Sequence, residues 1–258
     1  MSDESRPSPA QPPLAPAGAP VAAVIPAAGR GVRLGPGAPK ALRALNGTPM
    51  LIHAVRALAA SRHVSLVIVV APPDGAAEVK SLLDAHELPG SSTDFLVVPG
   101  GESRQESVRL GLAALPPEYG VVLVHDAARP LVPVDTVDAV IEAVRDGAPA
   151  VVPALPPADT VKEVEPAAEP GAPEPVVATP ERARLRAVQT PQGFDRATLL
   201  RAHETVTDDV TDDAGMVEKL GLPVVTVPGH EEAFKVTRPL DLVLAEAVLA
   251  RRRLNDGF

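Results

Sequence analysis

Apolar runs and amphipathic stretches alternate along the chain from Val21 onward. The apolar runs are rich in Val, Leu and Ile and have the length of strands, and they cover residues 21–26, 65–71, 94–99, 120–125 and 148–153. Stretches with helical periodicity lie between them, at about 49–60, 75–86, 103–115 and 133–145. The runs are continuous, as expected where helices cover both faces of a sheet. The pattern predicts an α/β fold with a Rossmann-like, doubly wound and mostly parallel sheet.

The alternation breaks between Pro156 and Pro180. Two β-prone pieces, at 161–164 and 175–178, flank a middle that is rich in Pro, Glu, Ala and Gly. Prolines in and beside these pieces argue against a central strand. We expect a protruding β-arm at about 156–180, with a solvated loop as the alternative. Beyond the arm, the pattern predicts strands near 185–189 and 224–227, and helices at about 196–204, 212–220 and 239–253.

The length of 258 residues fits one large α/β domain or two small ones, and we expect a single domain over residues 21–253. Residues 1–20 are rich in Pro, Ala and Ser and lack the basic start and apolar centre of a secretory signal. They are predicted to be a disordered tail, and residues 254–258 a short C-terminal tail. The longest apolar runs are shorter than the ~20 residues of a membrane span.

The amino-acid composition argues against several classes of binding partner and site. The formal net charge is −9, and the chain has no Trp and one Tyr, which argues against a nucleic-acid surface. The absence of cysteine excludes disulfides, thiolate metal sites and cysteine nucleophiles. We therefore expect a cytoplasmic protein that binds neither nucleic acid nor a membrane.

A glycine loop follows the first predicted strand. It reads Pro-Ala-Ala-Gly-Arg-Gly-Val-Arg over residues 26–33, and Lys40 follows shortly after. Glycines let backbone N–H groups approach a phosphate closely, and Arg33 and Lys40 supply positive charge. The sequence matches neither the P-loop nor the dinucleotide fingerprint. It suits a nucleoside triphosphate better than a dinucleotide, and the alternative is a plain glycine turn with basic residues at the surface.

Two further segments place polar residues at strand ends. A Gly-Gly pair at 100–101 precedes Ser103, where the alternative to base recognition is a helix cap completed by Glu106. The other segment reads His-Asp-Ala-Ala-Arg-Pro over 125–130. A carboxylate such as Asp126, one turn from an arginine, is a frequent arrangement for holding Mg²⁺ beside phosphates, and the alternative is a salt-bridged cap. His125 itself is predicted to be structural.

Later motifs complete an ordered set: Asp-Thr-x-Lys at 159–162, Thr-Pro-Gln at 190–192, Thr-Asp-Asp at 211–213 and Lys-Val-Thr-Arg-Pro at 235–239. Together with the segments above, this order resembles the 2-C-methyl-D-erythritol 4-phosphate cytidylyltransferase family over residues 21 to about 253. The resemblance implies transfer of CMP from CTP to 2-C-methyl-D-erythritol 4-phosphate, a polyol phosphate, in isoprenoid precursor biosynthesis. It also implies Mg²⁺ as the cofactor and a homodimer formed through the arm.

The resemblance further implies a role for each matching residue. The cations that act on the reacting phosphates would be Arg33, Lys40 and Lys235. CTP would be bound by Ala27, Ala28, Gly29, Gly31, Gly101, Glu102 and Ser107, with Glu102 in place of the aspartate often found. The acceptor would be bound by Arg129, Thr160, Arg182, Thr190 and Thr211. Asp126 would hold the metal. Before Lys235 the chain reads Glu-Glu-Ala-Phe where the family usually has a pattern like Asp-Asn-x, so the resemblance implies no second ligand here, and Glu232 is the residue that could substitute.

Two alternative functions stay open at this point. A ribitol 5-phosphate cytidylyltransferase would share nearly all of these motifs and differ in its acceptor. A non-catalytic nucleotide-binding regulator would share the fold, but it would need no paired cations around a reacting phosphate. Arg33, Lys40 and Lys235 are all present, which favours an enzyme.

Overall fold

The computed structural model describes residues 16, 18–29, 39–86, 93–208 and 210–255. Its centre is an eight-stranded sheet in the order β10-β7-β11-β6-β1-β4-β5, with β12 also paired to β7. The strands are Val21–Pro26 (β1), Val64–Ala71 (β4), Asp94–Pro99 (β5), Val121–Val124 (β6), Ala150–Leu155 (β7), Ala187–Val188 (β10), Gln192–Asp195 (β11) and Val224–Pro228 (β12). Strands β5, β4, β1 and β6 pair in parallel, as do β12 and β7, whereas β11 and β10 are antiparallel to their neighbours. The predicted fold class is confirmed.

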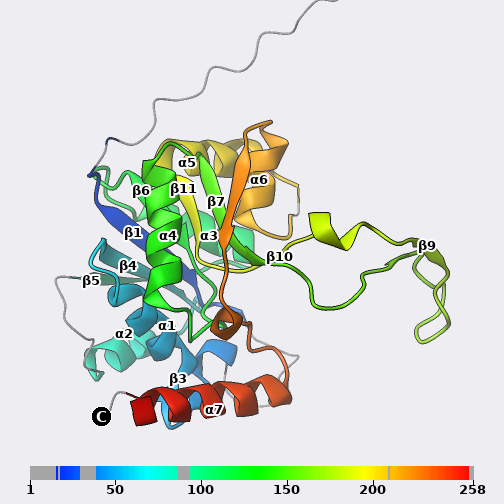
Figure 1. Cartoon of the computed structure of the whole chain (residues 1–258). Helices are drawn as coiled ribbons and strands as arrows, with labels where there is room; N and C mark the ends of the chain where they lie inside the picture. The colour runs from blue at the N-terminus through cyan, green and yellow to red at the C-terminus, as the bar shows by residue number, and fades with distance from the viewer. Residues whose placement is uncertain (1–15, 17, 30–38, 87–92, 209, 256–258) are drawn as a thin grey trace, which may run out of the picture.

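Helices cover both faces of this sheet (Figure 1). One face is covered by α1 (Met50–Ala59), α2 (Ala76–Asp84) and α4 (Val134–Arg145), and the other by α3 (Arg104–Ala113), α5 (Arg196–Thr205) and α6 (Asp213–Lys219). In β1, Val21, Ala23 and Ile25 pack in the first cluster, and Ala22 and Val24 pack in the second. Apolar side chains on both faces explain why the runs in the sequence are continuous.

Two strands of the central sheet depart from the expected pattern. No strand was predicted at β11, because its sequence Gln-Gly-Phe-Asp follows a turn signal and lacks a β-branched run. Gly193 is required there, since a Cβ would lie 2.4 Å from Cγ1 of Val140 on α4. Strand β5 forms one edge of the sheet and is only partly covered. Its apolar run therefore does not mean that both of its faces are buried.

The predicted arm is present. Strands β8 (Glu163–Val164) and β9 (Val176–Ala178) pair antiparallel and extend away from the rest of the molecule (Figure 1). Val164, Val176 and Val177 are exposed on it, with 36%, 58% and 62% of their surface accessible. A short 3₁₀ helix, η3 (Arg182–Arg184), lies where the chain returns from the arm toward β10. The arm's role in a dimer stays a prediction.

The C-terminal helix α7 (Pro239–Asn255) packs beside a small hairpin of β2 (Ala44–Leu45) and β3 (Thr48–Pro49). A separate apolar cluster joins these elements and is made of Leu45, Met50, Leu131, Val236 and Ala245. Because Val236 belongs to this cluster, the chain on either side of it is anchored against the main domain. None of the helices in the described ranges is long and apolar enough to cross a membrane.

Candidate active site

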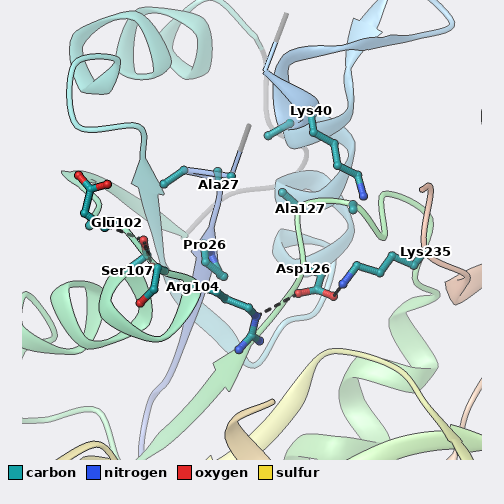
Figure 2. Close-up of a pocket in the computed structure, with 15 residues that line it drawn as sticks. Pro26, Ala27, Lys40, Glu102, Arg104, Ser107, Asp126, Ala127 and Lys235 are labelled. Carbon is teal, nitrogen blue, oxygen red and sulfur yellow. Dashed lines mark hydrogen bonds and ion pairs between the residues drawn. The ribbon is translucent and has the colours of Figure 1, made fainter. Parts of the chain in front are cut away.

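A pocket lies at the carboxyl ends of β1, β5 and β6, where doubly wound sheets bind their ligands (Figure 2). Its wall is formed by residues 26–29 after β1, by 101–104 and Ser107 after β5, and by 126–128 after β6. Lys40 and Ala41, from the short 3₁₀ helix η2 (Lys40–Leu42), and Lys235 complete the lining. Figure 2 shows both lysines on one side of the pocket, with Glu102 and Ser107 on the opposite side.

Asp126 is the centre of a charged cluster in this pocket. Its Oδ2 lies 2.8 Å from Nζ of Lys235 and 3.8 Å from Nε of Arg129, and its Oδ1 lies 3.6 Å from Nε of Arg104. Burial by itself raises the pKa of Asp126, but Lys235 and then Arg104 and Arg129 outweigh it and lower the pKa to about 2. The carboxylate is therefore ionised, and the cluster keeps an excess of positive charge that suits a polyanion.

Hydrogen bonds fix the loop that carries Asp126. The Asp126 N–H donates to Oγ1 of Thr190 at 3.0 Å, and this oxygen lies 3.0 Å from Nδ1 of His125. Burial lowers the pKa of His125 to about 4, so the ring is neutral at pH 7. Nε2 of His125 lies 3.0 Å from the Arg129 carbonyl, which only accepts, so Nε2 carries the proton and Nδ1 accepts from Thr190. His125 is structural, as predicted.

The glycine pair after β5 is also held by side chains. Ser107 Oγ accepts from the Gly101 N–H at 3.2 Å and donates to the Ser103 carbonyl at 2.9 Å. Ser103 caps α3 by accepting from the Glu106 N–H at 3.0 Å, and Glu106 Oε2 accepts from the Glu102 N–H at 2.9 Å. A Cβ on Gly101 would lie 2.3 Å from Cδ of Glu106. The helix cap of the sequence analysis is therefore present, and it shapes one wall of the pocket.

The segment around Lys235 is tied to the Asp126 loop through its backbone. The Val236 N–H donates to the Ala128 carbonyl at 2.8 Å, and Nη1 of Arg129 donates to the Ala233 carbonyl at 2.7 Å. Glu232 pairs instead with Arg251 and Arg252 of α7. These arginines engage the Glu232 carboxylate, and Glu232 lines a different cleft, so the structure does not bring it together with Asp126.

Comparison with known proteins identifies the family. The family model for IspD, 2-C-methyl-D-erythritol 4-phosphate cytidylyltransferase, matches residues 21–251. The chain belongs to this family. It is 85% identical over 258 residues to the 2-C-methyl-D-erythritol 4-phosphate cytidylyltransferase of Streptomyces avermitilis, and 83% identical over 271 residues to that of Streptomyces coelicolor, covering 100% of both chains in each case.

Solved structures of cytidylyltransferases share the fold. The 2-C-methyl-D-erythritol 4-phosphate cytidylyltransferase of Thermus thermophilus is 35% identical, with a TM-score of 0.67 over 88% of this chain and 97% of that one. The 4-diphosphocytidyl-2C-methyl-D-erythritol synthase of Anaerococcus prevotii is 27% identical, with a TM-score of 0.75 over 90% of this chain and 99% of that one. The resemblance drawn from the sequence motifs is confirmed at the level of family and fold.

The pocket brings together only part of the predicted set for this cytidylyltransferase. The predicted residues that line it are Ala27, Ala28, Gly29, Lys40, Gly101, Glu102, Ser107, Asp126 and Lys235. Arg129 and Thr190 lie beside it and use their polar groups to hold the Asp126 loop. The exposed residues Thr160, Arg182 and Thr211 are not among the lining residues, and Arg182 donates to the Ala158 carbonyl of the arm. Gly31 and Arg33 lie outside the described residues.

Arg104 is a pocket residue that the sequence analysis gave no role. It is the first residue of α3, and its Nη1 donates to Oδ2 of Asp213 at 2.7 Å. A cation in the first turn of a helix is disfavoured by the helix dipole. That unfavourable placement, three residues after the Gly100–Gly101 pair, is the signal in the sequence by which a functional arginine could have been found.

The residues of the pocket fit a magnesium site in which the protein supplies few of the ligands. The described part of the chain holds no group of three or more His, Cys, Asp or Glu placed to bind a metal ion. Magnesium is usually bound through one or two carboxylates together with substrate phosphates and water. Asp126 supplies one ionised carboxylate in the pocket, and its Oδ1 lies beyond hydrogen-bond distance of Arg104. Asp126 therefore fits as one protein ligand, with the other positions left to phosphate and water oxygens.

Proposed function

We propose that residues 21–253 form one catalytic domain that transfers CMP from CTP to 2-C-methyl-D-erythritol 4-phosphate, giving 4-CDP-2-C-methyl-D-erythritol and pyrophosphate. The observation that carries the proposal is the cluster of Lys235, Arg104 and Arg129 around Asp126, in a pocket that Lys40 also lines. Relatives at 85% and 83% identity bear the methylerythritol phosphate name, which favours that acceptor over ribitol 5-phosphate and an enzyme over a regulator.

The chemistry needs charge neutralisation rather than a strong base. An oxygen of the acceptor phosphate attacks the α-phosphorus of CTP in line and forms a new P–O bond. At the same time the bond breaks between the α-phosphorus and the oxygen that bridges it to the β-phosphorus, and pyrophosphate leaves. A phosphate monoester is already anionic at neutral pH, so no residue has to deprotonate it. The obstacle is the approach of two anions. Lys40 and Lys235, with Arg33, offset that repulsion and stabilise charge on the transferring phosphoryl group.

The opposite wall of the pocket recognises the nucleotide. The backbone of residues 27–29 follows β1 directly and offers N–H groups to the triphosphate. Gly101 and Glu102 lie where the base and ribose bind, and Ser107 holds the Gly101 N–H in place from a buried position. Backbone groups of this loop read the exocyclic amine of cytosine.

Asp126 would hold the divalent cation, and the neighbours of Asp126 keep its carboxylate in position. Mg²⁺ bound there would act as a Lewis acid and neutralise negative charge on oxygens of the triphosphate. Thr190 fixes the Asp126 backbone, and Lys235 keeps the carboxylate ionised while presenting its own charge to the reacting phosphate. The role of each site residue is part of this proposal.

The acceptor is bound between two subunits of a homodimer. Arg129, Thr190 and Thr211 belong to the main domain, whereas Thr160 and Arg182 stand at the roots of the arm, which extends away from the main domain (Figure 1). Exposed valines and short extended strands on the arm favour pairing with a second copy. Through that pairing, the arm roots of one subunit face the acceptor site of the other.

Pyrophosphate release from CTP tests this function. The assay compares 2-C-methyl-D-erythritol 4-phosphate, ribitol 5-phosphate and no acceptor under the same conditions, with Mg²⁺ present. We expect rapid release with the first acceptor and slow or no release in the other two reactions. Equal or faster release with ribitol 5-phosphate, or no release above the acceptor-free rate, would contradict the proposal.

A further inference from the structure

Arg104 bridges two carboxylates at unequal distances. Its Nη1 donates to Oδ2 of Asp213 at 2.7 Å, while its Nε lies 3.6 Å from Oδ1 of Asp126. The first contact is a charge-assisted hydrogen bond, and the second is an ion pair without one. Figure 2 shows the Arg104 side chain reaching from α3 toward Asp126 on the side opposite Lys235. The guanidinium is therefore held back from the Asp126 carboxylate by a competing anion.

That competing anion is itself fixed in position. Nε2 of His203, on α5, donates to Oδ1 of Asp213 at 2.9 Å, because an ionised carboxylate can only accept. The side chains of Asp213 and His203 are 1% and 3% exposed, so neither has room to turn. Burial by itself raises the pKa of Asp213, but His203 and then Arg104 outweigh it and lower that pKa. Asp213 is thus a permanent, immobile negative charge at the start of α6.

We propose that Asp213 and His203 are positioning residues that keep Arg104 off Oδ1 of Asp126 and so keep this oxygen available to a divalent cation. Without the Asp213 charge, the Arg104 guanidinium moves onto the Asp126 carboxylate, where a planar fork binds both oxygens well. It then competes with the metal for the same atom. This inference rests on the proposed role of Asp126 as the metal ligand.

Binding of Mn²⁺ to the enzyme–CTP complex tests the inference without turnover, because no acceptor is added. The paramagnetic enhancement of water-proton relaxation separates enzyme-bound Mn²⁺–CTP from the free complex. For Asp213→Asn we expect the apparent Mn²⁺ dissociation constant to rise about tenfold, in the range found when a group supporting a metal ligand is lost. Adding Arg104→Gln to Asp213→Asn should return the constant toward the parent value, since the competing cation is gone.

Variants of His203 give a second, matched comparison. His203→Gln keeps a donor for Asp213 and should bind Mn²⁺ like the parent, whereas His203→Leu should weaken binding as Asp213→Asn does. If a thermal unfolding measurement shows that Asp213→Asn does not fold, the inference is tested with the two His203 variants instead. Parent-like Mn²⁺ binding by both Asp213→Asn and His203→Leu, or no recovery in the double variant, would overturn the inference.

A separate variant distinguishes the failure of this inference from the failure of the function on which it rests. Asp126→Asn should weaken Mn²⁺ binding at least as much as Asp213→Asn. If Asp126→Asn leaves Mn²⁺ binding unchanged, the metal-binding role of Asp126 is wrong, and the inference is overturned with it. If only the Asp126 variant weakens binding, that role stands and the positioning role of Asp213 and His203 is wrong.

Discussion

Lys235 forms an ion pair of 2.8 Å with Asp126, joining the segment before α7 to the end of β6. The two residues are far apart in the sequence, and a backbone hydrogen bond from Val236 to Ala128 holds their segments side by side. The pairing holds the Lys235 ammonium at the pocket, where its charge faces the space that the nucleotide is proposed to fill. Preorganised charge of this kind stabilises a transition state on which negative charge builds up.

Lys40 should be needed for catalysis more than for folding. Lys40 lines the pocket from η2, on the side where Lys235 also lies. Lys40→Ala should lower kcat/KM by about 10²–10³-fold, as expected when one preorganised donor to the transition state is lost. Lys80→Ala is the matched control, because Lys80 is exposed on α2 and pairs only weakly with Asp84. A Lys40→Ala variant that folds and keeps near-parent kcat/KM would refute this role.

The enzyme should prefer CTP strongly over UTP, ATP and GTP. A loop that accepts hydrogen bonds from the cytosine amine is left with unpaired polar groups when UTP binds, at a cost of several kcal/mol. The measurement is kcat/KM for each nucleotide at saturating acceptor. Gly101→Ala should weaken CTP use, because its Cβ would displace the Glu106 side chain that accepts from the Glu102 N–H, and Glu106→Ala alone should have a similar effect. Equal kcat/KM for CTP and UTP would rule out this mode of base recognition.

Asp241 should stabilise the start of α7 in a pH-dependent way. Its carboxylate accepts from the backbone N–H groups of Thr237 and Arg238, at 2.7 and 2.8 Å. Burial alone raises the pKa of Asp241, but these hydrogen bonds outweigh it and lower the pKa. A lowered pKa means that the stabilisation is complete above the unfolded-state value of about 3.9 and is lost as the pH falls through the folded-state value.

Asp241→Asn keeps an oxygen that can accept these hydrogen bonds but removes the charge, so it should cost about 0.5 kcal/mol at pH 7, in the range of a charge at a helix N-terminus, and clearly less near pH 3. Thermal unfolding of the parent and the variant at both pH values measures the difference. Asp84→Asn serves as the control, because Asp84 is exposed and should show a small effect at either pH. An Asp241→Asn effect of the same size at both pH values would show that the carboxylate charge does not contribute.

The arm should form the dimer through its strands rather than through its tip. Deleting residues 165–174 shortens only the tip, so the dimer and the acceptor KM should be preserved. Removing 156–180 takes away β8, β9 and Thr160, and should yield monomers with a raised acceptor KM. Solution mass and acceptor KM are measured for both deletions. A monomeric parent, or a full deletion that changes neither quantity, would contradict the proposed interface.

Strands and helices could be predicted from the sequence where the pattern of apolar residues matched the burial of the element in the structure. Continuous apolar runs located β1, β4 and β6, because the helices on both faces require apolar side chains at successive positions. Strand β11 was not predictable, since it is held by pairing with β6 and β7 and by the close packing of Gly193, not by its own β propensity.

The site was predictable as a set of motifs but not as a set of contacts. Asp126 and Lys235 were identified separately, and their ion pair depends on a chain reversal that no local pattern encodes. Thr190 was assigned to the acceptor, whereas in the structure its hydroxyl holds the Asp126 backbone and His125. Arg104 was not assigned a role, because its contact with Asp213 joins it to a helix that is distant in the sequence. The acceptor site, the Mg²⁺ site, the dimer and the cytoplasmic location stay predictions.

The central claim is a single in-line transfer that cations promote without a covalent intermediate. The most direct test uses CTP with a chiral sulfur-substituted α-phosphate and follows the configuration at phosphorus in the product by ³¹P NMR. One direct displacement by the acceptor phosphate predicts inversion of configuration in the 4-CDP-2-C-methyl-D-erythritol analogue. Retention would require two displacements through a covalent enzyme intermediate, and would contradict the account.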